Sequence, residues 1–378
     1  MNIHMPLRIV HIIPNLRKGG AERLAIAICN ELAKREQVVV RLVTFSSLNE
    51  YPEYSNSDIW DVVPASYIPS VTKKHQSNIA ELQAYVDDFK PDVIHTHLWI
   101  GDFVSRHIHY PHAKWFSHLH DNMPQLQKYL IPFSKAKITN WFERKMLIPK
   151  YIETNTRFIA IAHDSYAFAQ QNLPNVLHQN AILLHNAIDV NHFSAAHSQH
   201  KCADTKINLL SVGSLVAKKN QSFLLSVVEY LHQKQVPCEL HILGEGSDRK
   251  KIEDRIEKKS LQDAVILHGN KDVEEFYKKA DVYVHAATYE PFGLVLIEAM
   301  AAGLPVVCLD GKGNRDIIRH GKNGYIVYDK KVAEFAEYII TLYKNSNIYS
   351  AISKEALITA SEYNITDYID TLLEIYQS

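Results

Sequence analysis

Short apolar runs that favour strands alternate along the whole chain with stretches of helical periodicity. This alternation is typical of βαβ units, in which helices cover a parallel sheet. The series stops in a polar, pattern-free tract at residues 189–206 and then starts again. The runs expected to be strands are 7–14, 38–45, 92–98, 114–120, 157–163 and 181–188 before this tract, and 207–215, 238–246, 264–270, 281–287, 305–310 and 324–329 after it. The sequence therefore predicts an α/β protein with two Rossmann-like domains.

The composition excludes several classes of protein. A chain of 378 residues is long enough for two domains with separate cores. Its formal net charge of −1 argues against a nucleic-acid-binding protein with a global basic field. The most apolar long stretch, 293–309, is interrupted by Glu298 and Pro305 and is too short for a bilayer span. The four cysteines are scattered and no signal peptide is apparent, so we expect a cytoplasmic protein with reduced thiols.

Two glutamates bracket the segment EPFGLVLIE, and the second one is unusual. The neighbours of Glu298 are nearly all apolar, so its carboxylate should enter the interior and needs protein donors or a ligand there. A helix over 292–302, with Pro291 in its first turn, would place Glu290 and Glu298 ~12 Å apart. Free backbone amides at the positive helix end would lie between them: Phe292, Gly293, Leu294 and Val295. Such a site suits a nucleotide sugar; the alternative is a core helix whose Glu298 pairs with backbone or arginine.

With the flanking segments AGLPVV and GKGNRDIIRHGKNGYIV, this block resembles the retaining GT-B glycosyltransferases. The signature of this large GT4-like family is Glu, seven residues, Glu, and the resemblance covers nearly the whole chain. It implies a GT-B fold, in which two Rossmann-like domains face each other across a cleft and a C-terminal helix packs back on the first domain. It also implies an acceptor-binding domain over 1–190, a nucleotide-sugar-binding domain over 191–355 and a returning helix over 356–378.

The resemblance assigns roles to individual residues. Glu298 would hold the ribose hydroxyls, and Glu290 the hydroxyls of the donor sugar. The segment SVGSLVAKKN matches the family pattern that ends in a phosphate-binding lysine, here Lys219, although Ser214 stands where the family has arginine. The second positive charge would then come from another cation: Lys218, Arg17 or Arg23. The segment FSHLHDNMP matches the His-Asp at a strand end that places His120 near the reacting centre. The expected catalytic residues are therefore Glu290, His120 and Lys219.

Strand ends and glycines supply the other expected contacts. Gly19 and Gly20 lie between a strand and a helix, where they either make a tight turn or let backbone amides approach a phosphate. His97 at a strand end and Asn186 in the hinge-like HNAIDV are the expected acceptor contacts. The expected donor-binding set is Gly19, Gly20, Ser214, Lys219, Gly269, Glu290, Phe292, Gly293, Leu294, Val295 and Glu298. Taken singly, the histidines could instead be core residues and the lysines solvated.

A metal site is not expected. His95 and His97, like His118 and His120, are i,i+2 pairs that project to one face of a strand, but neither pair has a third convergent ligand in the sequence. A D-x-D motif for Mg²⁺ or Mn²⁺ is absent. We therefore expect no metal and no cofactor, since the nucleotide sugar is a substrate.

The segment 125–150 has an unusual composition, with six basic residues, one acid and four aromatics. Basic residues beside aromatic ones suit an anionic membrane surface. The alternative is a core-packing helix with a solvated basic face. Many members of the family act on lipid-linked acceptors, which favours a peripheral association with the inner face of the membrane.

The resemblance implies a metal-independent retaining glycosyltransferase that moves a hexose or N-acetylhexosamine from a UDP- or GDP-sugar to a hydroxyl group. The expected acceptor is a glycan or a lipid-linked molecule in cell-surface polysaccharide or glycolipid synthesis, and nucleic acid is not an expected partner. Two alternatives stay open on the same fold: a nucleotide-sugar 2-epimerase and a non-catalytic nucleotide-sugar-binding protein. No motif in the sequence identifies the sugar, the nucleotide base or the acceptor.

Overall fold

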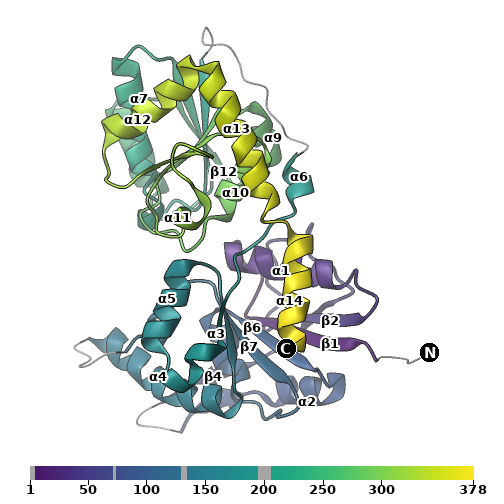
Figure 1. Ribbon diagram of the computed structural model, residues 1–378. Helices are drawn as coiled ribbons and strands as arrows, with labels where there is room; N and C mark the ends of the chain where they lie inside the picture. The colour runs from purple at the N-terminus through teal and green to yellow at the C-terminus, as the bar shows by residue number, and fades with distance from the viewer. Residues whose placement is uncertain (1–4, 71–73, 129–133, 195–205) are drawn as a thin grey trace. The chain divides into compact units, whose positions relative to one another are not determined.

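The computed structural model describes residues 5–70, 74–128, 134–194 and 206–378. The chain divides into two compact units: unit 1 is Met1–Ala187 with Ile365–Ser378, and unit 2 is Ile188–Asn364. Each unit is built on its own parallel sheet, as expected (Figure 1). Most of the polar tract expected between the two domains, residues 195–205, lies outside the described residues.

Unit 1 contains a seven-stranded sheet with the order β3-β2-β1-β6-β7-β8-β9. Its strands are β1 (Leu7–Ile13), β2 (Val38–Thr44), β3 (Trp60–Val62), β6 (Val93–His97), β7 (Lys114–Leu119), β8 (Arg157–Ala160) and β9 (Ala181–Leu183). Two short strands, β4 (Ser66–Ile68) and β5 (Gln76–Asn78), form a separate antiparallel pair. The strand order reverses between β1 and β6, so ligands are expected at the carboxyl ends of these two strands.

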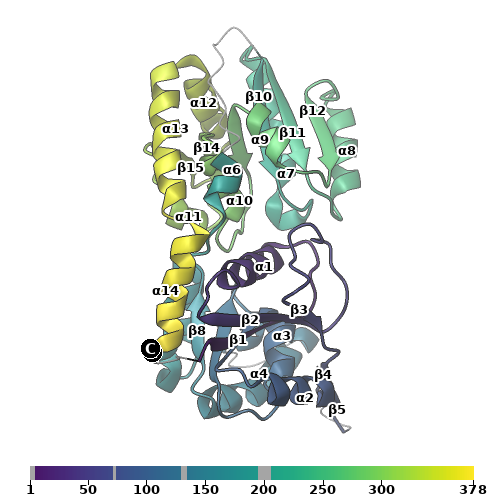
Figure 2. The same cartoon turned by 90° about the vertical axis from the view of Figure 1, so that its right-hand side faces the viewer.

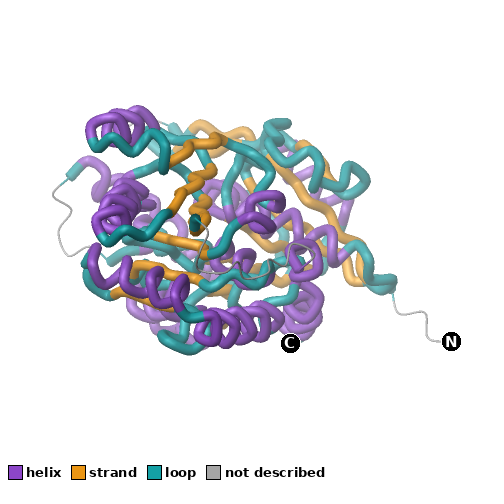
Figure 3. The backbone as a smooth tube through the Cα atoms, turned by 90° about the horizontal axis from the view of Figure 1, so that it is seen from above, coloured by secondary structure: helices purple, strands orange, loops and turns teal. Residues whose placement is uncertain are grey.

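Helices cover both faces of this sheet. They are α1 (Gly20–Leu32), α2 (Ala80–Phe89), α3 (Leu98–Ser105), η1 (Pro124–Leu126), α4 (Lys135–Glu153), α5 (His163–Asn172), η2 (Asn175–Asn180) and α14 (Ile365–Gln377). Ile9 and Ile13 of β1 pack with α1 and α14, whereas Val10 and Ile12 pack with α2 on the opposite face. This alternation explains why β1 is apolar at nearly every position. Figure 3 distinguishes the helices and strands by colour.

The last helix of the chain completes unit 1. α14 packs on α1 (Figure 1), and its buried Ile369, Leu372 and Tyr376 join the cluster that contains Ile9 of β1. A returning helix was expected over 356–378, but α14 begins only at Ile365. Residues up to Ser361 instead form the end of another helix, in unit 2, because the chain leaves the helical conformation at residues 362–364.

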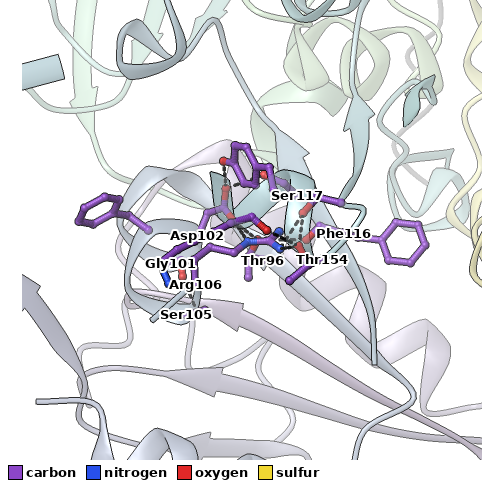
Figure 4. A network of polar contacts seen from close by, with 12 residues as sticks. Thr96, Gly101, Asp102, Ser105, Arg106, Phe116, Ser117 and Thr154 are labelled. Atoms are coloured by element: carbon purple, nitrogen blue, oxygen red, sulfur yellow. Dashed lines mark hydrogen bonds and ion pairs between the residues drawn. The ribbon is translucent and has the colours of Figure 1, made fainter. Parts of the chain in front are cut away.

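A buried ion pair fastens neighbouring strands of unit 1 (Figure 4). Asp102 of α3 and Arg106 form a salt bridge of 3.0 Å, and both side chains are fully buried. Asp102 also accepts hydrogen bonds from Thr96 of β6 at 2.7 Å, from Ser117 of β7 at 2.8 Å and from Tyr151 of α4. Hydrogen bonds to the remaining polar atoms offset the cost of burying such a pair. Arg106 Nη1 donates to Thr154 and Thr156, whereas Nη2 has no hydrogen bond to a described residue. The bonds of Asp102 connect β6, β7 and α4.

Unit 2 contains a six-stranded parallel sheet with the order β12-β11-β10-β13-β14-β15. Its strands are β10 (Ile207–Val212), β11 (Cys238–Leu243), β12 (Val265–Gly269), β13 (Val282–His285), β14 (Val306–Leu309) and β15 (Tyr325–Val327). The order reverses between β10 and β13, which makes the carboxyl ends of these strands the switch point of unit 2.

The helices of unit 2 pack along this sheet and against one another. They are α6 (Val190–Ser194), η3 (Ala217–Lys219), α7 (Gln221–Gln233), α8 (Arg249–Lys258), α9 (Glu274–Lys279), α10 (Leu294–Ala301), α11 (Asn314–Ile317), α12 (Val332–Lys344) and α13 (Ser346–Ser361). α7 lies along β11, and α12 lies along β14 and β15 and beside α13 (Figure 2). In the described part of the chain, no helix combines the length and hydropathy that a bilayer span requires.

The helix that carries Glu298 is shorter than expected. α10 begins at Leu294 rather than at 292, and Gly293 precedes it with a φ of +108°, a left-handed conformation that suits glycine. Pro291 therefore lies before the helix, and its expected position in the first turn is wrong. The reason is a backbone bond of 2.7 Å from Glu290 N–H to the carbonyl of Gly311, which keeps this segment extended beside the next loop.

Candidate functional site

Three polar side chains meet at the switch point of unit 2. Lys219 ends η3 after β10, His285 ends β13, and Glu290 lies in the loop that follows β13. Because β10 and β13 are paired neighbours, the segments that follow them meet at one edge of the sheet. Glu290 Oε2 accepts a hydrogen bond from His285 Nε2 at 3.0 Å and forms a salt bridge with the Lys219 ammonium. The structure thus brings together two of the expected catalytic residues.

Glu290 is ionised although it is only 7% exposed. Burial acts to raise the pKa of this carboxyl, but the charge of Lys219 and the hydrogen bond from His285 lower the pKa to about 2. Burial lowers the pKa of His285, so its ring is neutral at pH 7 and donates through Nε2. A carboxylate held in this way accepts hydrogen bonds from hydroxyl groups and does not act as a general acid.

The predicted burial of Glu298 is confirmed, since this residue of α10 is 1% exposed. Its Oε2 accepts a hydrogen bond of 3.1 Å from the hydroxyl of Tyr277 on α9. A tyrosine hydroxyl is therefore one protein donor to the buried carboxylate.

The start of α10 offers three backbone donors. The Leu296 N–H donates to the Gly293 carbonyl at 2.9 Å. The N–H groups of Gly293, Leu294 and Val295 have no acceptor within the described part of the chain. Phe292 is buried against the ring of Tyr363. Of the four amides expected to be free, those of Gly293, Leu294 and Val295 have no acceptor among the described residues.

Close contacts between loops account for the presence of glycine at two positions of unit 2. A Cβ on Gly244 would lie 2.2 Å from the carbonyl oxygen of Gly213. Gly269 ends β12 with a φ of +71°, and its carbonyl accepts a hydrogen bond from Gly244 N–H at 2.8 Å. Ser214 is exposed in the loop after β10. Gly269 at the end of β12 and Ser214 after β10 therefore lie at the same sheet edge as Lys219, with β11 between their strands. Their contact with a nucleotide stays a prediction.

The glycine pair of unit 1 favours the tight turn. Gly19 precedes α1 in an extended conformation. Its N–H donates to the Tyr51 hydroxyl and its carbonyl accepts from the same hydroxyl, each at 3.0 Å. The Gly19 amide is thus engaged, whereas Gly20 is exposed at the first position of the helix.

Expected residues of unit 1 lie in a buried histidine cluster at the ends of β6 and β7. His97 is fully buried, and both ring nitrogens are bonded: Nδ1 to His120 Nε2 at 2.9 Å and Nε2 to His11 Nδ1 at 2.8 Å. His120 is 8% exposed, and burial lowers its pKa to about 3, so the ring is neutral at pH 7. His120 therefore bonds to another histidine, not to the backbone. Contact of the buried His97 with an acceptor would need a rearrangement and stays a prediction, as does that of Asn186, which is 4% exposed.

The segment 125–150 has two different parts, with residues 129–133 outside the described residues. Leu147 and Tyr151 of α4 are fully buried in the core of unit 1. The first turns of α4 are largely exposed, including Ile138 at 49% and Trp141 at 38%. Arg144 donates to the carbonyls of Leu126 and Asn172 and is therefore structural. The end of the helix packs in the core, as the alternative expects, and its beginning presents basic and apolar groups to the surface. Association of this surface with a membrane stays a prediction.

Sequence reasoning missed two residues of the site, His285 and Tyr277. The only signal for His285 was a polar residue at the end of an apolar strand, five positions before Glu290. Tyr277 reaches Glu298 from a different helix, and no spacing in the sequence indicates this contact.

Two family models match this chain. Residues 193–358 match the family described as Glycosyl transferases group 1, and residues 18–192 match Glycosyltransferase Family 4. An uncharacterized glycosyltransferase of Haemophilus influenzae is 24% identical over 93% of this chain and 94% of its own length. A poly(ribitol-phosphate) alpha-N-acetylglucosaminyltransferase of Staphylococcus aureus is 29% identical over 53% of this chain and 41% of its own. Several other curated relatives are also matched over less than half of their length.

Solved structures share the fold. Anabaena HepE, in complex with UDP and glucose, superimposes with a TM-score of 0.76 at 19% identity, over 99% of this chain and 100% of its own. Two family matches that together run from residue 18 to 358, and a fold shared over the whole chain, place this protein among the GT4-like, group 1 glycosyltransferases of the GT-B fold.

Proposed function

We propose that the protein transfers a hexose or N-acetylhexosamine, with retention of configuration, from a UDP- or GDP-sugar to a hydroxyl group of a glycan or lipid-linked acceptor. The observation that carries this proposal is the ionised Glu290 between Lys219 and His285 at the switch point of unit 2. The staphylococcal relative is named for N-acetylglucosaminyl transfer to a cell-surface polymer, and HepE was solved with UDP and glucose. These likenesses favour a UDP-sugar and a role in cell-surface glycan synthesis.

In the proposed reaction, Lys219 exchanges partners. Its ammonium pairs with Glu290 in the structure. When the donor binds, the diphosphate attracts Lys219, and Glu290 accepts hydrogen bonds from the sugar hydroxyls while His285 keeps it in place. Both protein contacts of Glu290 use Oε2, and Oε1 has no partner among the residues described. Oε1 is therefore the atom we assign to the sugar.

The leaving group is stabilised without a metal ion. The Leu294 and Val295 amides at the positive end of α10, together with Lys219, are placed to offset charge on the diphosphate. Glu298 holds the ribose hydroxyls in this proposal. The Glu298 carboxylate then accepts hydrogen bonds both from the Tyr277 hydroxyl and from the ribose. In this proposal, Phe292 and Gly293 line the path by which the diphosphate reaches the backbone N–H groups of α10.

Neither glutamate acts as a nucleophile in the proposed mechanism. The bond between the anomeric carbon and the diphosphate oxygen breaks, and the acceptor oxygen bonds to the same face of the sugar. The departing diphosphate oxygen takes the acceptor proton. By its family resemblance, the neutral His120 orients the reacting sugar, and Asn186 and His97 contribute to the acceptor side.

Two assays test this function. A panel of UDP- and GDP-sugars should contain a donor that raises the melting temperature, because only a ligand that binds the folded state stabilises it. That donor is then incubated with and without a panel of hydroxyl acceptors, and the products are separated by chromatography. Transfer with retained anomeric configuration, read by NMR, supports the proposal. Interconversion of donors without an acceptor identifies the epimerase, and binding without hydrolysis or transfer identifies the non-catalytic protein.

A further inference from the structure

Five buried histidines from three neighbouring strands of unit 1 form one cluster on the face covered by α14. They are His11 of β1, His95 and His97 of β6, and His118 and His120 at the end of β7. The strand register places His11 opposite His95 and His97 opposite His118. The rings stack, with centroids 4.7 Å apart for His95 and His97 and 4.2 Å apart for His118 and His120. Two triads have ligand nitrogens that all lie within 4.8 Å of one another: His11, His95 and His97, and His97, His118 and His120.

One ring in this cluster lacks the bonds that a buried imidazole needs. His118 is fully buried, and neither of its ring nitrogens forms a hydrogen bond of normal geometry with a described residue. The Asn186 side chain interacts with this ring but forms no hydrogen bond of normal geometry with it. Leaving a buried polar group unpaired costs about 1–3 kcal/mol. An apolar side chain at this position would avoid that cost, so a core-packing role does not account for His118.

We propose that His97, His118 and His120 form a binding site for one first-row transition-metal ion of the class that prefers imidazole, with Zn²⁺ as the test ion. The ligand atoms are His97 Nδ1, His120 Nε2 and a ring nitrogen of His118. Tetrahedral Zn²⁺ with bonds of about 2.0–2.1 Å holds its ligand nitrogens roughly 3.3–3.4 Å apart. The ligand nitrogens lie within 4.8 Å of one another, and the stacked rings of His118 and His120 have to turn so that their lone pairs converge on the ion.

One hydrogen bond already joins two of the proposed ligand atoms. His97 Nδ1 and His120 Nε2 are 2.9 Å apart and share one proton. An ion replaces this hydrogen bond when that proton moves to the other nitrogen of its ring, because a neutral imidazole keeps one N–H and binds a metal through its second nitrogen. The same ion supplies a partner for His118.

This triad is a better metal site than the deeper one. In the deeper triad, both nitrogens of His11 and Nδ1 of His95 already have hydrogen-bond partners. All three of its residues are fully buried, whereas His120 is 8% exposed and gives an ion a route to the ligands.

The deeper histidines, His11 and His95, instead form hydrogen bonds behind the metal ligand His97. When His97 binds the ion through Nδ1, its Nε2–H donates to His11 Nδ1 at 2.8 Å. His11 Nε2–H then donates to the Tyr376 hydroxyl of α14 at 3.3 Å, and that hydroxyl donates to His95 Nδ1 at 2.5 Å. Histidine ligands usually donate their second N–H to such an acceptor, which fixes the tautomer and the ring orientation. Here this chain of donors is already in place.

The inference goes beyond the proposed glycosyl transfer and does not depend on it. Metal binding is measured on the protein alone, without a nucleotide sugar, so it can succeed or fail independently. An ion on His120 would occupy the ring that the proposed reaction uses, and added Zn²⁺ should therefore slow transfer rather than support it.

The test is titration of the full chain with Co²⁺ and Zn²⁺, followed by calorimetry and by the visible absorption of bound Co²⁺. We expect one ion per chain with a tetrahedral cobalt spectrum that lacks thiolate bands. His118→Gln and His120→Ala should each weaken binding at least about tenfold, and Tyr376→Phe, which removes the hydroxyl from that chain of donors, should weaken it by about tenfold. His241→Gln is the matched control, since His241 also bonds to a histidine, His268, at 2.9 Å, but this pair has no third ligand among the described residues.

Absence of stoichiometric binding in the wild-type protein would overturn the proposal. Equal affinity in His120→Ala, in His118→Gln and in the His241→Gln control would overturn it as well. Because His118 is buried, the melting temperature of each variant is measured first. If His118→Gln does not fold, the more exposed His120→Ala decides the outcome.

Discussion

Replacing Glu290 by glutamine removes a charge while keeping the shape of the side chain. The contacts with Lys219 and His285 lower the pKa of Glu290 from an ordinary value of 4.5 to about 2. Each pKa unit corresponds to 1.36 kcal/mol, so the ionised form is stabilised by about 3 kcal/mol in the folded protein. Because the folded pKa is the lower one, this stability is present above pH 4.5 and is lost as the pH falls toward 2.

Glu290→Gln should therefore lower the free energy of unfolding of unit 2 by up to about 3 kcal/mol at pH 7. The difference from the wild type should shrink between pH 4.5 and pH 2. The measurement is denaturant unfolding at several pH values, with the transitions of the two units resolved. Glu337→Gln, at an exposed position of α12 in the same unit, is the control and should change little.

The same substitution separates structure from catalysis. Turnover should fall by orders of magnitude, while the affinity for the nucleoside diphosphate should not decrease, because Lys219 is released to pair with the phosphates. A double-mutant cycle with Lys219→Met measures the coupling between the two side chains directly. Unchanged turnover would show that Glu290 does not take part in the reaction. A stability difference that persists at pH 2 would refute the assigned origin of the pKa shift.

Four further predictions concern the nucleotide, the phosphates, the metal requirement and the acceptor. Glu298→Ala should weaken nucleotide binding by about 1–3 kcal/mol in calorimetry, and equal affinity would make Glu298 purely structural. Lys219→Ala should lower turnover more than donor affinity, because charge on the diphosphate grows as the sugar leaves; an equal loss in both would contradict this. Transfer should survive EDTA, and a loss that Mn²⁺ restores would show a metal requirement. Exposed lysines of the segment 125–150 should each contribute up to ~1 kcal/mol to binding of anionic liposomes, and this contribution should weaken with added salt. Unchanged cosedimentation after their replacement would contradict membrane docking. The lysines to replace with glutamine are Lys128, Lys135, Lys137 and Lys145.

Apolar patterning was sufficient to predict most of the fold. Each run of residues expected to be a strand contains one, from β1 to β15. The strands that were missed, β3, β4 and β5, have three residues each and are mostly exposed, so they carry no apolar signal. The start of α10 was misplaced because the backbone of Glu290 pairs with a loop that follows a later strand, and local helix signals do not report such a contact.

Some residues of the candidate site could be predicted from their own segments, and others depend on contacts between distant segments. Glu290 and Lys219 were recognisable from their own segments, but the approach of His285 depends on the pairing of β10 with β13. The histidine pairs of β6 and β7 were visible as i,i+2 spacings. Their convergence into one cluster with His11 depends on the register of β1, β6 and β7. Tertiary packing sets this register, so no single segment of the sequence predicts it.

The position of α14 also has a consequence for synthesis on the ribosome. Unit 1 emerges first, but the apolar face of β1 and α1 stays uncovered until Tyr376 and the rest of α14 have left the exit tunnel. Unit 2 is continuous in sequence and can fold while that face is still open. The first unit to appear is therefore the last to be completed, and throughout elongation its exposed surface is the part of the nascent chain most in need of protection from aggregation.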